Sequence, residues 1–351
     1  MDLKAIVLDI DGTLLNDQKV ITPRTRESLL RAQEAGVKLV LASGRPLPAM
    51  LKFSKELKME HYHGLLLSNN GACVTDCATD EMLFSQSISE EIGSALLTHL
   101  EQFDVKPMIA HKNYMYVNNV YDCMITAPPH GLRNIIEYES RSGDFKLCEV
   151  EHLADFVDFP LHKILIAGEP DYLAQHWQEI MQPFEGRING FFSAPFYFEI
   201  ADKGIDKAYA LDKTLRSLGI NAEQVISFGD GQNDASIIAY AGVGIAMGNA
   251  IDALKASANE ITLSNNEDGI AHMLERYLCD QNKLKSQIAS LTLDAVWLFW
   301  VTGIIPGEER FAGYYPANED HFPGKGGFTG NFQPNEVGNT GEDFLTGISR
   351  P

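Results

Sequence analysis

The chain begins with a regular alternation of short apolar runs and amphipathic stretches. Short, mainly apolar runs at 5–8, 37–42 and 65–67, interrupted only by Lys38, end in polar residues, which is typical of strands buried inside a parallel sheet. Between the first two runs, Thr22-Pro23 provides a helix N-cap followed by proline, and Gly36 ends that helix. The pattern predicts an α/β fold with a doubly wound, mostly parallel sheet and right-handed crossovers.

The alternation changes in the middle of the chain and then returns. Residues 84–190 have the pattern of an inserted α+β unit, whereas Asp206 can cap a new helix and the apolar run 225–228 predicts another strand of the first sheet. We therefore predict a discontinuous core domain over residues 1–83 and 191–280, interrupted by an α+β cap domain over residues 84–190.

Residues 281–351 continue neither pattern. Of the 29 glycines, 10 lie between Gly303 and Gly347 without a sustained period, which indicates an irregular C-terminal extension. The apolar run around Trp297 is short and interrupted, so we interpret it as a packed or interfacial helix and expect no membrane span.

Composition limits the class of partner. A formal net charge of −20 disfavours binding to nucleic acid or to an anionic membrane, because phosphates attract clusters of Lys and Arg. We expect a small-molecule partner, and the composition predicts no particular oligomeric state. The 5 cysteines lack a paired metal-binding spacing, and no signal peptide precedes the first strand, so we expect reduced thiols and a cytoplasmic protein.

Acidic side chains recur where predicted strands end. Asp9 and Asp11 follow the first strand, and Asp230 and Asp234 follow a later one. Open α/β sheets bind ligands at the carboxyl ends of their strands, and hard cations prefer carboxylate oxygens. The spacing predicts a Mg²⁺ site with Asp9 and Asp230 as direct ligands and Asp234 acting through water. Taken alone, the Asp-x-Asp-Gly pattern that starts at Asp9 also fits a surface turn or a calcium loop.

Two further residues are candidates for binding an anion. Ser43 ends the second strand at the same predicted edge of the sheet, although a serine before glycine also serves as a turn or helix cap. Lys207 lies in the first turn of a helix, where a cation opposes the helix dipole unless an anion binds nearby. The alternative is a solvated lysine, which Lys203 and Lys213 fit equally well. Together with the carboxylates, these residues suit phosphoryl transfer.

Four motifs, taken in order, resemble the haloacid dehalogenase superfamily, and within it the Cof-type, sugar-phosphatase-like branch with a C2-type cap. The motifs are Asp9-Ile10-Asp11-Gly12-Thr13, Ser43-Gly44-Arg45, Lys207 and Gly229-Asp230-Gly231-Gln232-Asn233-Asp234. The likeness covers roughly residues 1–278. Two features depart from it: Ala208 stands where the branch commonly has glycine, and the extension after Leu278 has no counterpart.

The resemblance implies an aspartyl-phosphate mechanism, in which Asp9 attacks phosphorus and Asp11 first protonates the leaving oxygen and then activates water. The implied phosphate-binding residues are Ser43, Gly44, Lys207 and Asn233. The implied Mg²⁺ ligands are Asp9, the backbone carbonyl of Asp11, Asp230 and, through water, Asp234.

The resemblance also sets the range of expected functions. It implies a Mg²⁺-dependent phosphatase of small phosphorylated metabolites, sugar phosphates above all. A flavin mononucleotide or pyridoxal phosphate phosphatase, and a phosphotransferase or mutase, are alternatives. A non-catalytic regulator that binds a phosphometabolite is a further one, although such a protein has no need of Asp11. The cap is expected to close over the site and to contact the leaving group, without any cap residue being assigned that role.

Overall fold

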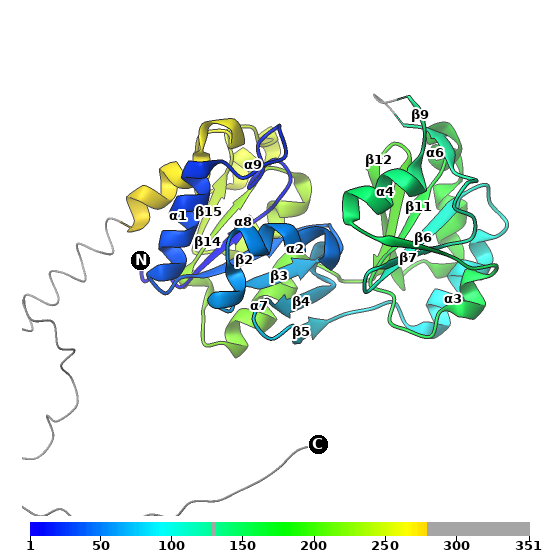
Figure 1. Cartoon of the computed structure of the whole chain (residues 1–351), viewed down its shortest axis with the longest axis horizontal. Helices are drawn as coiled ribbons and strands as arrows, with labels where there is room; N and C mark the ends of the chain where they lie inside the picture. Colours follow the sequence, from blue (N-terminus) through cyan, green and yellow to red (C-terminus); the bar gives the residue numbers. More distant parts are fainter. Residues whose placement is uncertain (128–130, 279–351) are drawn as a thin grey trace, which may run out of the picture. The chain divides into compact units, whose positions relative to one another are not determined.

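The computed structural model describes residues 1–127 and 131–278 (Figure 1). The predicted extension, with its apolar run around Trp297, lies outside these residues. Within the described ranges, no helix is both long enough and apolar enough to cross a membrane. Two large sheets organise this part of the chain.

The first sheet has eight strands and confirms the predicted α/β class. Its strands are β1 (Ala5–Leu8), β2 (Lys38–Ala42), β3 (Leu65–Ser68), β4 (Cys73–Asp76), β5 (Met82–Ser85), β14 (Val225–Gly229), β15 (Val243–Ala246) and β16 (Glu260–Ile261). Their order is β16-β15-β14-β1-β2-β3-β4-β5, parallel from β16 to β3. The antiparallel strands β4 and β5 were not predicted.

Helices cover both faces of the first sheet. They are α1 (Pro23–Glu34), α2 (Leu47–Glu56), α7 (Lys207–Ser217), α8 (Ala235–Tyr240), α9 (Asp252–Ser257) and a last helix whose described part is 269–278. Strand alternation sends Leu8 toward α1 and α2 and Val7 toward α7 and α8, in two separate clusters of buried side chains. The predicted caps form: the side chains of Thr22 and Asp206 accept hydrogen bonds from the first turns of α1 and α7.

The chain changes direction across the first sheet at β1. From β1 the strands proceed through β2 to β3 on one side, whereas β14, β15 and β16 proceed on the other. Such a switch point leaves a crevice at the carboxyl ends of the two neighbouring strands, where α/β proteins bind ligands. Asp9 directly follows β1, and Asp230 directly follows β14.

The second sheet is mixed and mostly antiparallel. Its strands are β6 (Lys106–His111), β7 (Tyr114–Val117), β10 (Lys146–Glu149), β11 (Ile164–Ala167), β12 (Ile188–Ala194) and β13 (Tyr197–Asp202), in the order β10-β7-β6-β11-β13-β12. The helices of this part are α3 (Glu90–Leu100), α4 (Ile135–Gly143), α5 (Leu153–Phe156) and α6 (Pro170–Met181). Buried residues of α3, α5 and α6 pack on one face, and those of α4 pack on the other. Strands β8 (Met124–Thr126) and β9 (Leu132–Asn134) form a separate ribbon.

One predicted domain boundary is wrong. Strands β12 and β13 hydrogen-bond to each other, and β13 pairs with β11, so the second sheet continues to Asp202. The predicted boundary between residues 190 and 191 would divide β12. The apolar run of β13 resembles a core strand, and only its pairing with β11 assigns it to the second sheet. The division into core and cap domains otherwise stays a prediction.

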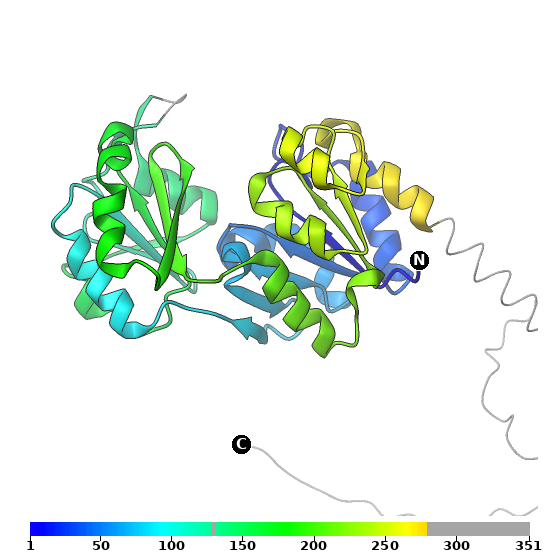
Figure 2. The ribbon, with the colours of Figure 1, turned by 180° about the vertical axis from the view of Figure 1, so that it is seen from behind.

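Two neighbouring crossings connect the sheets (Figure 2). The outgoing crossing follows β5, and the returning crossing follows β13 and contains Gly204, whose φ of +89° favours glycine. The side chain of Gln86 joins them, because its Nε2 donates to Asp202 Oδ1 at 2.6 Å and to the Lys203 carbonyl at 3.2 Å.

Candidate active site

A buried lysine connects two of the predicted carboxylates. Lys207 is the first residue of α7 and is only 2% exposed. Its Nζ donates to Asp9 Oδ1 at 2.8 Å, to Asp234 Oδ1 at 2.8 Å and to the Ala42 carbonyl at 3.0 Å. The ammonium group therefore uses all three of its protons within the protein and holds the ends of β1 and β2 against the loop after β14.

Negative charge is in excess around this lysine. Burial raises the pKa of Asp9, and Asp234 and Asp230 raise it further, although Lys207 opposes the shift. Burial also raises the pKa of Asp230 to about 6. Burial works against the charge on Lys207, but the two carboxylates outweigh that effect and raise its pKa. Three carboxylates share one ammonium group, so the cluster is suited to a further cation.

The loop after β14 is shaped around Asp230 and Asp234. Asp234 Oδ2 accepts hydrogen bonds from the backbone N–H groups of Asp230 and Gly231, each at 3.0 Å. Asp230 Oδ1 accepts one from Thr13 Oγ1 at 2.8 Å. Gly12 has a φ of +88°, and a Cβ atom there would lie 2.3 Å from Asp230 Oδ2. The glycine of the first motif is therefore required for the close approach of Asp230.

The donor set fits a divalent cation. Oxygen atoms of Asp9, Asp230 and Asp234 lie within 4.8 Å of one another, and hard carboxylate oxygens suit Mg²⁺. Both oxygens of Asp234 already accept hydrogen bonds, which agrees with an indirect role for this residue. The Asp11 carbonyl and the identity of the metal stay predictions.

Asp11 is held separately from the buried cluster. Arg45 donates from Nε to Oδ2 at 2.6 Å and from Nη2 to Oδ1 at 2.8 Å, and Lys19 Nζ lies 3.3 Å from Oδ1. Burial works against ionisation of Asp11, but these cations outweigh it and lower the pKa of the carboxyl group. The guanidinium fork was not predicted, although Arg45 stands in the second motif.

The predicted phosphate-binding residues line one cavity of about 900 Å³ together with the carboxylates. Ser43 follows β2 and is buried, and its Oγ accepts the N–H of Arg45 at 3.2 Å. Asn233 Nδ2 lies 3.5 Å from Asn70 Oδ1. Asn70 was not predicted as a site residue, and its φ of +55° is the structural signal that marks it. The structure brings all the predicted site residues together, while their chemical roles stay predictions.

The fold and the position of these residues define an α/β protein whose candidate site lies at the switch point of a doubly wound sheet. The chain belongs to the haloacid dehalogenase-like hydrolases, because the model of that family matches residues 6–274. The predicted resemblance is therefore confirmed.

Individual relatives agree with this assignment. A haloacid dehalogenase-like hydrolase from Bacteroides thetaiotaomicron has 35% sequence identity and a TM-score of 0.72, covering 78% of this chain and 99% of its own. A Bacillus subtilis 5-amino-6-(5-phospho-D-ribitylamino)uracil phosphatase, YitU, is 29% identical over 78% of this chain and 96% of its own length. The pyridoxal phosphate phosphatase YbhA of Escherichia coli is 28% identical over 79% of this chain and 100% of its own. These names agree with the predicted enzyme class.

Proposed function

We propose that this protein is a Mg²⁺-dependent hydrolase of small phosphate monoesters, sugar phosphates above all. The observation that carries the proposal is that Asp9, Asp230, Asp234 and Lys207 lie together at the switch point, with Asp11 lining the same cavity. Phosphoryl transfer needs this combination of a nucleophile, a proton carrier and positive charge near the phosphate.

The proposed reaction has two steps. In the first, a carboxylate oxygen of Asp9 forms a bond to phosphorus, the bond from phosphorus to the leaving oxygen breaks, and Asp11 gives that oxygen a proton. In the second, Asp11 takes a proton from water while the water oxygen attacks phosphorus and the bond to Asp9 breaks. The products are an alcohol and inorganic phosphate, and Asp9 and Asp11 return to their starting states.

Arg45 affects the protonation of Asp11 in the first step. Asp11 accepts one hydrogen bond from Arg45 on each of its oxygens, and this pairing favours the ionised carboxylate over the acid. Separation of Asp11 from the guanidinium group would favour the protonated form that the first step needs. The released guanidinium group then lies in the same cavity, where it can pair with a phosphate oxygen.

The remaining residues bind and orient the substrate in this proposal. Ser43, Gly44, Asn233 and Lys207 hold phosphate oxygens, with Lys207 exchanging one of its present partners for the substrate. Asp9, Asp230, the Asp11 carbonyl and, through water, Asp234 would hold Mg²⁺. The bound ion would offset the charge between the phosphate and the Asp9 carboxylate.

The relatives support a small organic leaving group. The Bacillus phosphatase is named for a substrate with a ribityl chain, which carries several hydroxyl groups, and the Escherichia enzyme is named for pyridoxal phosphate. The four described cysteines are free, which supports the further proposal of a cytosolic enzyme.

The test is phosphate release from a panel of esters in the presence of Mg²⁺. We expect Asp9→Asn to lower kcat by roughly a thousandfold or more, because the amide is a poor nucleophile. Asp80→Asn is the matched control, since Asp80 is exposed and its positive φ suits asparagine. Its activity should equal that of the wild type.

Equal release by Asp9→Asn and the wild type would remove Asp9 from its proposed role. Release from no ester in the panel would favour a regulator that only binds phosphometabolites. Transfer of phosphate to a second sugar hydroxyl, detected by product analysis, would identify a mutase or phosphotransferase instead.

A further inference from the structure

The wall of the cavity opposite the carboxylate cluster comes from the second sheet and α4. Leu165 of β11 and Phe191 of β12 both stand opposite Glu199 of β13 in the strand register. Alternate residues of a strand share a face, so Tyr197 lies on the same face of β13 as Glu199, and Lys163 directly precedes β11. All five residues line the cavity.

The charges on this wall are unequal. Glu199 is 8% exposed, and its Oε2 lies 3.2 Å from Lys163 Nζ, which also donates to the Gly44 carbonyl at 3.1 Å. Glu139 of α4 is partly buried, and its Oε2 accepts a hydrogen bond from Tyr197 Oη at 3.1 Å. Among the described residues of this wall, two carboxylates therefore face one lysine.

Packing alone does not account for two carboxylates here. Burial raises the pKa of Glu139, against the opposing effects of Lys163 and of the hydrogen bond from Tyr197. A carboxylate in such a place is costly compared with an apolar side chain of similar size, which could join α4 to β13 equally well. A carboxylate also accepts several hydrogen bonds, so Glu139 and Glu199 retain capacity for a bound molecule.

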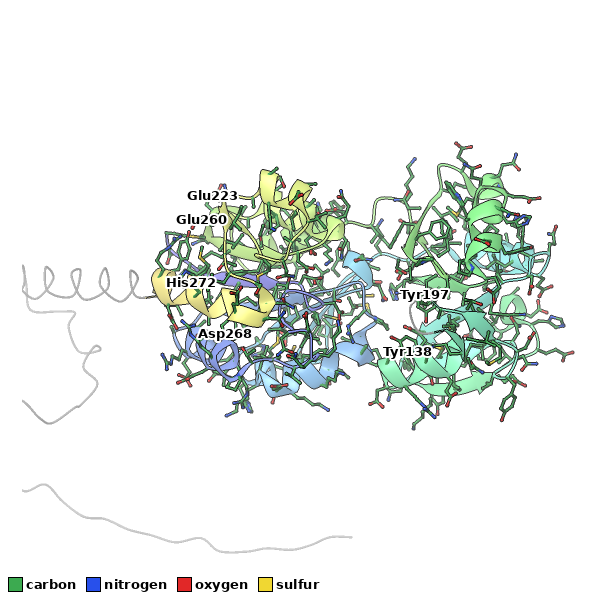
Figure 3. The ribbon with its side chains drawn as sticks, turned by 90° about the horizontal axis from the view of Figure 1, so that it is seen from above. Tyr138, Tyr197, Glu223, Glu260, Asp268 and His272 are labelled. Atoms are coloured by element: carbon green, nitrogen blue, oxygen red, sulfur yellow. The ribbon has the colours of Figure 1, made fainter. Side chains whose placement is uncertain are left out.

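Apolar side chains line the same cavity. Phe191 of β12 is 41% exposed and lines the cavity, as does Tyr138 of α4. Figure 3 labels Tyr138 and Tyr197, and both lie on the same side of the part of the chain that contains the second sheet. Aromatic faces next to carboxylate acceptors suit a ligand with hydroxyl groups and exposed C–H bonds.

We propose that Glu139 and Glu199 select the leaving group: they favour an uncharged, hydroxyl-bearing or amino-bearing group over one with a second phosphate or a carboxylate. The proposal rests on the proposed function, since the leaving group belongs to the phosphate ester bound at Asp9. Lys163 neutralises one of the two carboxylates, so an additional anion in the cavity meets net repulsion.

Hexose derivatives of different charge test the proposal. They are glucose 6-phosphate, glucosamine 6-phosphate and 6-phosphogluconate, whose leaving groups are neutral, cationic and anionic. Because 6-phosphogluconate is an open chain, glucitol 6-phosphate is included as its neutral open-chain counterpart. For the full chain with Mg²⁺, we expect kcat/KM for the first two to exceed that for 6-phosphogluconate by about tenfold or more. Calorimetry measures the binding of each ester whether or not it is hydrolysed, and p-nitrophenyl phosphate tests hydrolysis itself.

Charge variants should change this preference in opposite directions. Glu199→Gln releases Lys163 from its partner and should raise kcat/KM for 6-phosphogluconate, relative to glucose 6-phosphate, by about tenfold. The double variant Glu139→Gln/Glu199→Gln should reverse the preference. Lys163→Met should strengthen it. Glu137→Gln is the control, because Glu137 lies on the exposed side of α4, paired with Arg141, and should leave all ratios unchanged.

The outcomes separate the two proposals. Failure to release phosphate from p-nitrophenyl phosphate and from every ester contradicts the proposed function. Release with equal or stronger binding of 6-phosphogluconate contradicts only the selection by Glu139 and Glu199. Ratios unchanged in both glutamine variants, with thermal unfolding midpoints at the wild-type value, would also overturn it. A variant that fails to fold is replaced by Glu199→Asp, which keeps the charge and should keep the preference.

Discussion

The two walls of the cavity hold their charged side chains in different ways. On the first-sheet wall, Asp9, Asp234 and Lys207 are buried and joined by hydrogen bonds of 2.8 Å. On the second-sheet wall, Glu199 lies 3.2 Å from Lys163, and Glu139 is bound by a tyrosine hydroxyl. Charges joined in one network of several hydrogen bonds keep fixed positions, whereas Glu199 and Glu139 each have a single side-chain partner among the described residues and can exchange it. Stability and turnover should therefore depend on the first-sheet wall (the first wall), and the preference among phosphate esters on the second-sheet wall (the second wall).

The largest effect should follow removal of the buried ammonium group. Lys207→Met leaves Asp9 and Asp234 buried without their cation, so we expect a loss of about 3–5 kcal/mol in the free energy of unfolding. Urea denaturation measures it. Lys213→Met, on the exposed side of the same helix, should change the free energy by less than about 0.5 kcal/mol. A loss of similar size in both variants would mean that α7 tolerates no methionine. It would contradict a particular contribution of the buried Lys207 cluster to stability.

A smaller effect should follow from filling the space beside Asp230. In Gly12→Ala the new methyl group collides with the Asp230 carboxylate and the backbone is strained, so we expect a loss of about 1–3 kcal/mol together with loss of turnover. Gly36→Ala separates the two causes, because Gly36 has a similar φ of +86° and no atom within 4 Å of the added Cβ. The control should show the strain but retain kcat. Full activity in Gly12→Ala would show that Asp230 can move without consequence.

The smallest effect is expected on the second wall. Tyr197→Phe removes the hydrogen bond to Glu139 and should lower the free energy of unfolding by about 1 kcal/mol. Turnover of p-nitrophenyl phosphate should stay within about twofold of the wild type, because this change leaves the first wall intact. Tyr121→Phe, at a residue that is 85% exposed, should alter neither quantity. A loss of turnover as large as that of Asp9→Asn would show that the walls do not act separately.

The first wall could be predicted because its signals are local. Each acidic motif directly follows a continuous apolar strand, and parallel strands bring their carboxyl ends to one edge of the sheet. Lys207 lies in the first turn of a helix that Asp206 caps, but only the sheet context and the family resemblance distinguished it from Lys203 and Lys213. The pairing of Arg45 with Asp11 was missed, since nothing local identifies a partner 34 residues away.

The second wall could not be predicted, because its residues converge only through strand register. In β13 five of six residues are buried, so the apolar pattern does not reveal which face Glu199 occupies. Its position opposite Leu165 and Phe191 follows from pairing with two other strands. The start of α4 depends on a cap by Asn134, whose side chain accepts a hydrogen bond from the Glu137 N–H. Pairing between strands that are distant in the sequence cannot be predicted from the residues of either strand alone.

The link made by Gln86 has a mechanical consequence. Its side chain fastens the outgoing crossing to the returning one, through Asp202 and Lys203. Two connecting segments without such a link could change their backbone conformations independently of each other. Because Gln86 ties the two crossings together, the predicted closing of the cap over the site would turn both crossings as one unit.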